Sequence, residues 1–246
     1  MQKFAVDLHI HTALSPCAEE EMTPPAVLAR AAANGLRIIA ITDHNSACNT
    51  PAFVEAAAGG PVTVIPGMEV QTREEVHLVC LFAEPEEALA WQEVVYAHLP
   101  PLKNNERVFG TQQLLNAAGE VTGIEERLLL ASTDFSVEEV VAGVHARHGI
   151  CYPAHVDRPA FSIIGSLGFI PPDLQIPVVE ISRNINRKRA LEKFPFLERY
   201  HLLGSSDAHR LDEISQVRTR IGLKEPAFEA LAEALWDRSQ NRIEVD

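Results

Sequence analysis

Short apolar runs that end in a histidine or a carboxylate recur along this chain and constrain its fold more than any other feature. The runs predicted as strands are Phe4–Leu8, Arg37–Thr42, Val62–Ile65, Val76–Phe82, Ile150–Ala154, Val178–Ser182, His201–Gly204 and a further one near Val217–Ile221. Nearly continuous apolar strands are typical of a buried parallel sheet that is covered by helices. Seven or eight strand–helix units favour a closed barrel over an open sheet. We therefore predict an α/β fold, a distorted (β/α)7 TIM-like barrel.

Helices are predicted between several of these strands. Thr23 precedes two prolines as a plausible N-cap, and Ser136 with Glu139 matches a capping box. Further helices are expected at Pro85–Ala97, Thr111–Ala118 and Glu225–Arg238. Residues 84–144 contain no good strand candidate, so we expect a helical insertion there, within a single domain that spans residues 1–246.

Composition narrows the classes of partner. The 246 residues are 46% hydrophobic, and no apolar stretch is long enough to cross a bilayer. The N-terminus turns polar too soon for a secretory signal, so we expect a cytoplasmic protein without a membrane partner. A formal net charge of -13 repels a phosphate backbone and disfavours a long nucleic acid. A small phosphorylated substrate remains compatible, if bound metal ions reverse the local field. Nothing in the sequence indicates an oligomeric state.

The polar residues that follow the strands, together with His77 near the start of Val76–Phe82, have the side chains of a metal site. They are His9, His11, Asp43, His44, Glu69, His77, His155, Asp207 and His209. The carboxyl ends of barrel strands converge on one face, so these side chains are expected to meet. Alternate residues of a strand point the same way, which would let His9 and His11 reach one ion. For His77, a hydrogen-bonded core position is the alternative.

Histidine nitrogens mixed with carboxylate oxygens suit zinc, manganese or iron better than calcium. Eight candidate ligands, with Asp43 set aside, exceed the four to six positions of one ion, so two or three divalent ions are expected. Glu69 is well suited to bridge a pair of ions. Such a cluster can hold a hydroxide between metals that attacks phosphorus.

The motifs HIH, ITDHN, GMEV, VHLV, PAH and SSDAH occur in this order between Asp7 and His209. In this order they resemble the PHP (polymerase and histidinol phosphatase) superfamily of metal-dependent phosphoesterases. The resemblance implies a distorted (β/α)7 barrel with a two- or three-metal centre that hydrolyses phosphate esters. It also implies three ligand sets: His9, His11, Glu69 and Asp207 for one ion, Glu69, His77 and His155 for a second, and His44 with His209 for a third.

Cys17 marks a departure from the superfamily, in which the segment after H-x-H commonly supplies a histidine or aspartate to the third ion. Cys17 is thus a possible ligand as a thiolate, Glu19 or Glu20 could substitute, or the third ion could bind weakly. Asp43 is predicted to orient a ligand histidine from behind. Arg158, three residues after His155, is predicted to hold a phosphate oxygen during catalysis.

Two other functions remain open. One is metal-dependent hydrolysis of amides on a similar barrel, although such barrels typically use a bridging lysine where this chain offers Glu69. The other is a metal-bound domain that regulates a partner without catalysis. The sequence lacks the G-x-S-x-G and P-loop signatures of serine hydrolases and NTPases. We expect a hydrolase that cleaves a small phosphate ester.

Overall fold

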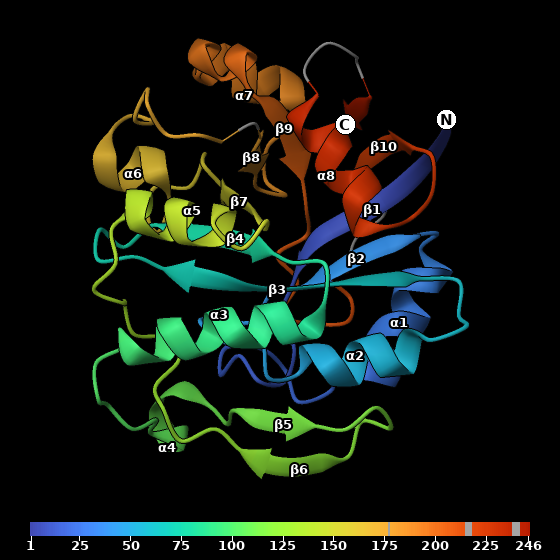
Figure 1. The fold of residues 1–246 in the computed structure, drawn as a ribbon, viewed down its shortest axis with the longest axis vertical. Coiled ribbons are helices and arrows are strands. Elements are labelled where there is room, and N and C mark those ends of the chain that lie inside the picture. Colours follow the sequence, from blue (N-terminus) through green and yellow to red (C-terminus); the bar gives the residue numbers. More distant parts are fainter. Residues whose placement is uncertain (177, 215–217, 238–241) are drawn as a thin grey trace.

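A curved sheet of seven strands forms the centre of the molecule (Figure 1). The computed structural model describes residues 1–176, 178–214, 218–237 and 242–246. In spatial order the seven strands are β11 (Ile243–Val245), β10 (Thr219–Leu223), β1 (Gln2–Ile10), β2 (Ile38–Ile41), β3 (Thr63–Gln71), β4 (His77–Leu81) and β7 (Ile150–Pro153). A separate parallel pair consists of β8 (Val178–Ile181) and β9 (His201–Gly204).

The parallel pair completes the curve of the sheet. β8 contacts β7, and β9 contacts β11, so the pair lies between the two ends of the seven-stranded sheet. The strands β2, β4, β7 and β8 are buried along their whole length, as their apolar sequences predict. The α/β fold class, a distorted TIM-like barrel, is confirmed.

The expectation of a parallel sheet is wrong at β4, and also at β10, which runs antiparallel to both β1 and β11. The strands β1, β2 and β3 are parallel, whereas β4 runs antiparallel to both β3 and β7. The physical reason is the short connection between β3 and β4, residues 72–76, because a parallel crossover needs a dozen residues or more. The short connection could not be predicted from the sequence, because β3 extends six residues past the predicted end at Ile65. The strand continues through Pro66 and Gly67 to Gln71.

Helices cover the outside of the sheet. The structure contains α1 (Pro24–Ala33), α2 (Thr50–Ala57), α3 (Pro85–Ala97), α5 (Val137–His145), α6 (Ile163–Leu167), α7 (Arg187–Lys193), the 3-10 helix η1 (Pro195–Arg199) and α8 (Phe228–Trp236). Figure 1 shows α2 and α3 alongside β3, where both contact that strand. The predicted capping box of Ser136 and Glu139 is present at the start of α5.

Three apolar clusters hold these layers together. One is centred on α1 and α2, with Val27 and Phe53 fully buried. The second, with Trp91 and Val140, joins α3 and α5 to the sheet, and the third packs α8 through Leu231. Burying such side chains removes apolar surface from water at roughly 1.5–3 kcal/mol each. This packing fixes the strand ends that carry the polar residues.

The segment 84–144 is not purely helical, so the helical insertion is not confirmed. Besides α3, a short α4 (Glu106–Phe109) and the start of α5, it contains a hairpin of β5 (Gln113–Leu115) and β6 (Val121–Ile124). A helix was predicted at Thr111–Ala118, but Asn116 starts a turn there. Its side-chain oxygen accepts from the backbone N–H groups of Ala118 and Glu120, and Gly119 has a φ of 82°.

Two other predictions reach beyond the described residues. Val217, at the start of a predicted strand, and Arg238, at the end of a predicted helix, lie outside them. In the part of the chain that the structure describes, no helix has both the length and the apolar character needed to cross a bilayer.

Candidate metal centre

Strand β1 places two buried imidazoles side by side at its carboxyl end. His9 and His11 are fully buried, and their Nε2 atoms lie 3.2 Å apart. The other ring nitrogen of each is held by a buried oxygen. Nδ1 of His9 faces Glu180, and Nδ1 of His11 lies 2.9 Å from the hydroxyl of Ser15. The predicted i, i+2 geometry is present, and both Nε2 atoms face the interior of the cluster.

Glu69 is the centre of the cluster, on the buried end of β3. Its two carboxylate oxygens contact ring nitrogens of five histidines from four different segments. The distances are 3.2 Å to Nε2 of His9, 3.6 Å to Nε2 of His11, 3.0 Å to Nδ1 of His44, 3.0 Å to Nδ1 of His77 and 3.2 Å to Nε2 of His155. One buried carboxylate surrounded by imidazoles has the arrangement of a bridging ligand.

The antiparallel direction of β4 is what brings His77 into the cluster. In the register of β3 and β4, His77 pairs with Gln71, near the same end of β3 as Glu69. His77 therefore starts its strand where the parallel strands finish theirs.

Asp207 closes the cluster from the other end of the chain. Its Oδ1 lies 3.1 Å from Nε2 of His11 and 3.4 Å from Nε2 of His9. Its Oδ2 is paired with the guanidinium of Arg158 at 2.7 Å. A backbone hydrogen bond keeps Asp207 close to β1, because the N–H of His11 donates to the carbonyl of Ala208 at 3.0 Å.

A third group forms around His209. Potential ligand atoms of His11, His44 and His209 all lie within 4.8 Å of one another, and the rings of His11 and His209 stack at 4.1 Å. Cys17 is exposed at the edge of this group. The protein around its thiol raises the pKa by desolvation, but His44 and His209 outweigh this and lower the pKa to about 6.

The donor atoms fit divalent ions. Among the described residues, Nδ1 of His155 is buried without a hydrogen-bond partner, and Nδ1 of His44 and Oε2 of Glu69 are buried 3.0 Å apart with no further hydrogen-bond partner. Such atoms are costly to bury unless something binds them. Burial raises the pKa of Glu69, yet His77 and His9 hold it well below its usual range, so the carboxylate is ionised. The same balance of burial and histidines lowers the pKa of Asp207.

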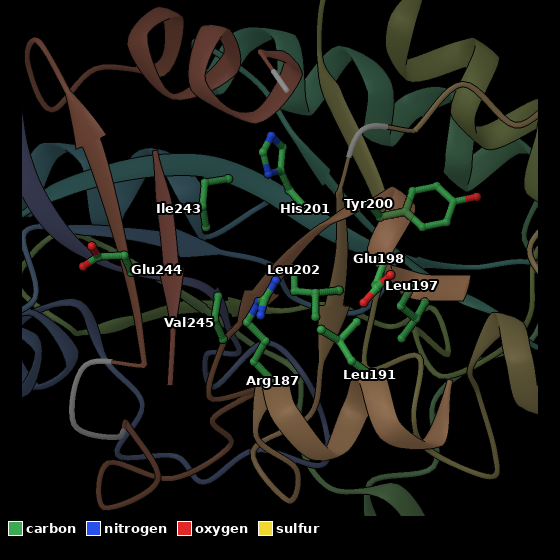
Figure 2. Close-up of a pocket in the computed structure, with 10 residues that line it drawn as sticks. All are labelled: Arg187, Leu191, Leu197, Glu198, Tyr200, His201, Leu202, Ile243, Glu244 and Val245. Carbon is green, nitrogen blue, oxygen red and sulfur yellow. The ribbon is translucent and has the colours of Figure 1, made fainter. Parts of the chain in front are cut away.

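The cluster opens into a cavity of about 300 Å³. Its lining combines candidate ligands with four other side chains, which are Gln71, Leu130, Arg158 and Phe161. A second cavity of about 290 Å³ lies between α7, η1, β9 and β11 (Figure 2). Among the described residues, its lining includes none of the candidate ligands. The chemistry therefore belongs to the first cavity.

Sequence reasoning missed Glu180. Glu180 is a buried charge inside the apolar strand β8, and that contrast was the available signal. Asp43 was expected to orient a ligand histidine. It accepts hydrogen bonds from the backbone N–H and hydroxyl of Thr12, and from the hydroxyl of Ser15 at 2.7 Å. It therefore reaches His11 only through Ser15.

A family model of the PHP domain matches residues 7–162. The chain belongs to the PHP domain family. The match covers more than half of the chain and includes most of the candidate ligands. Asp207 and His209, which lie beyond it, share the same cluster with the matched residues. A search of curated protein sequences found no match.

Solved structures share this PHP fold at low sequence identity. The lesion-specific endonuclease EndoQ from Pyrococcus furiosus matches with a TM-score of 0.71 and 18% identity over 99% of this chain, which spans 58% of the endonuclease chain. A candidate metal-dependent phosphoesterase from Bifidobacterium adolescentis matches with a TM-score of 0.60 and 17% sequence identity. The match covers 94% of this chain and 96% of the phosphoesterase chain. An amidohydrolase from Chromobacterium violaceum, solved with bound sulfate and no metal, matches with a TM-score of 0.59 and 18% sequence identity. The match covers 96% of this chain and 99% of the amidohydrolase chain. These identities establish a shared fold.

Proposed function

We propose that this PHP protein is a metal-dependent phosphoesterase that hydrolyses a small phosphate ester. The observation that carries the proposal is Glu69, one buried carboxylate in contact with four imidazoles at 3.0–3.2 Å. Four ring nitrogens within 3.2 Å of one buried carboxylate match the histidine and carboxylate donors that divalent metal sites use.

The candidate ligands divide into three sets that share Glu69 and the histidine cluster. The proposed sets are His9, His11, Glu69 and Asp207 for one ion, Glu69, His77 and His155 for a second, and His44 and His209, with Cys17 as a possible partner, for a third. Bound divalent ions would supply an activated water and neutralise the charge that develops on a phosphoryl group. Zinc, manganese and iron all suit this donor set.

Arg158 is the proposed phosphate anchor. Its side chain is 32% exposed, lines the cavity and is paired with Oδ2 of Asp207. If Oδ1 of Asp207 binds an ion, Oδ2 would hold the guanidinium beside the site, and the remaining planar donors of Arg158 could bind a phosphate oxygen. Lysine is not among the residues described as lining the cavity, which counts against the lysine-bridged amide hydrolysis considered above.

A polymeric substrate is the main competitor to a small ester. Endonuclease Q, which shares this fold, has been solved with a 27-mer duplex that carries an abasic lesion at its active site. The net charge of -13 therefore does not decide against nucleic acid for this fold. We favour the small ester because the cavity, at about 300 Å³, lies at the lower end of the range for small-ligand sites.

The decisive experiment measures hydrolysis of a phosphate-ester panel with zinc, manganese or iron added, alongside elemental analysis of the purified protein. We expect metal-dependent turnover, and we expect Glu69→Gln and Asp207→Asn to lose metal and turnover together. Glu229→Gln, on the exposed face of α8, is the matched control and should retain both. Full metal content without hydrolysis of any ester would support the non-catalytic alternative. Full activity in Glu69→Gln would refute the proposed site.

A further inference from the structure

The segment from His155 to Ser162 presents an arginine and an aromatic ring to the same cavity. Arg158 and Phe161 both line it. The N–H of Arg158 donates to the carbonyl of His155 at 3.0 Å, and the hydroxyl of Ser162 donates to the carbonyl of Arg158 at 2.6 Å. The N–H of His77 donates to the carbonyl of Phe161 at 3.1 Å. Hydrogen bonds therefore hold the backbone of this segment at Arg158 and at Phe161.

Phe161 is held in a conformation that folding alone does not favour. Its φ is 56°, in the left-handed region that bulky L-residues avoid at a cost in free energy. Its side chain is 45% exposed, so burial of the ring returns only part of that cost. Exposed aromatic residues are ordinary on protein surfaces, but a strained one that lines a cavity requires another explanation.

The ring is also oriented. It stacks on the imidazole of His77, with 5.0 Å between ring centroids and 27° between planes. Stacking on one face leaves the exposed part of the ring available to a second planar group. Leu130 adds an apolar surface to the same cavity. One wall of the cavity is thus suited to a flat apolar group, and Arg158 is suited to an anion.

We propose that Phe161 determines specificity, by stacking on a nucleobase carried by the phosphate ester, so that the preferred substrate is a free nucleotide. This rests on the proposed phosphoesterase function and on Arg158 as the phosphate anchor. Aromatic side chains recognise nucleobases by stacking irrespective of sequence. Phe161 and Arg158 lie three residues apart in the chain and line the same cavity, so one ligand could contact both of them.

The test compares a nucleoside monophosphate with glycerol phosphate, which has a phosphate but no ring. We expect Phe161→Ala to lower kcat/KM for the nucleotide by about 10- to 100-fold, the loss that removal of one stacked base implies. Turnover of glycerol phosphate should change by less than about threefold, within the range of non-specific effects. Phe161→Trp should keep the nucleotide preference. Phe169→Ala, which removes another exposed phenylalanine that is not among the cavity-lining residues described, should match wild type.

Phe161→Gly separates stacking from folding. Glycine adopts a positive φ without strain, so this variant should unfold no earlier than Phe161→Ala while also losing the nucleotide preference. Equal loss on both substrates, or no loss on either, would overturn the proposal.

A single-stranded oligonucleotide with a terminal phosphate identifies the source of the base. Turnover of the mononucleotide in preference to the oligonucleotide supports a free nucleotide, and turnover of the oligonucleotide alone overturns that assignment. If wild type hydrolyses no ester, the proposed function fails. Calorimetric binding of the same two small esters then still tests Phe161, because loss of nucleotide-selective binding in Phe161→Ala supports stacking and unchanged selectivity refutes it.

Discussion

Glu180 accepts a hydrogen bond from His9: Oε1 lies 3.0 Å and Oε2 3.2 Å from Nδ1 of the imidazole. A carboxylate accepts, so His9 as a metal ligand would keep its proton on Nδ1, toward Glu180, and would present the lone pair of Nε2 to the ion. That Nε2 atom lies 3.2 Å from Glu69. Glu180 also accepts from the backbone N–H of His155 at 3.1 Å, so one buried carboxylate orients two candidate ligands.

Replacement of Glu180 should weaken metal binding without removing a ligand. We expect Glu180→Gln to lower metal affinity by about 10- to 100-fold, the usual effect of losing a carboxylate behind a ligand histidine. Glu180→Ala should lower it further, because the N–H of His155 would also lose its partner. The measurement is a competition titration against a chromophoric chelator. Unchanged affinity in both variants would mean that Glu180 serves only the packing of β8.

Cys17 should report directly on a third ion. If its thiolate binds zinc together with His44 and His209, zinc should slow alkylation of Cys17 by iodoacetamide. Cobalt substitution should give a thiolate charge-transfer band that Cys17→Ser lacks. Cys48→Ser is the matched control, since Cys48 contacts Gln92 instead of the histidine cluster. Equal alkylation rates with and without zinc would exclude the thiol as a ligand.

Metal removal should destabilise the folded protein. The cluster buries two carboxylates and several imidazoles whose ligand atoms are assembled only in the folded state. At about 100 times the dissociation constant, one bound ion adds about 2.7 kcal/mol to the free energy of unfolding. We expect zinc to raise and chelator to lower the midpoint of thermal unfolding, and Glu69→Gln to reduce the difference. Identical melting curves under both conditions would contradict a metal site.

Gly67 should tolerate no side chain. A Cβ at Gly67 would lie 2.6 Å from the carbonyl oxygen of Cys80 and 2.8 Å from the side chain of Leu81, in the pairing of β3 with β4. We expect Gly67→Ala to lower the free energy of unfolding by about 1–3 kcal/mol, as overpacking usually does. Gly222→Ala is the control, because its nearest contact would be at 3.7 Å. Urea denaturation measures both, and equal stability of the two variants would contradict the predicted clash.

The residues that meet at the centre could largely be predicted from the sequence. Most of the predicted strands end at a polar side chain, and the carboxyl ends of parallel strands meet at one face. That is why the pair His9 and His11 could be assigned to one cluster with Asp207, which lies far from them in the chain. The capping box of α5 was predictable for a similar reason, since its contacts are local.

The pairing of the strands and the contacts behind the candidate ligands could not be predicted from the sequence, because they depend on the packing of distant segments. The direction of β4, which brings His77 to Glu69, depends on where β3 ends. Because β3 contains Pro66 and Gly67, which are uncommon inside strands, the apolar pattern of the sequence predicted that β3 ends too early. The β5–β6 hairpin depends on a turn at Asn116 whose hydrogen bonds appear only in the folded chain. Glu180 contacts His9 across 171 residues of sequence. Local periodicity records which side chains are buried, but a contact between distant buried groups is fixed only when the strands pack.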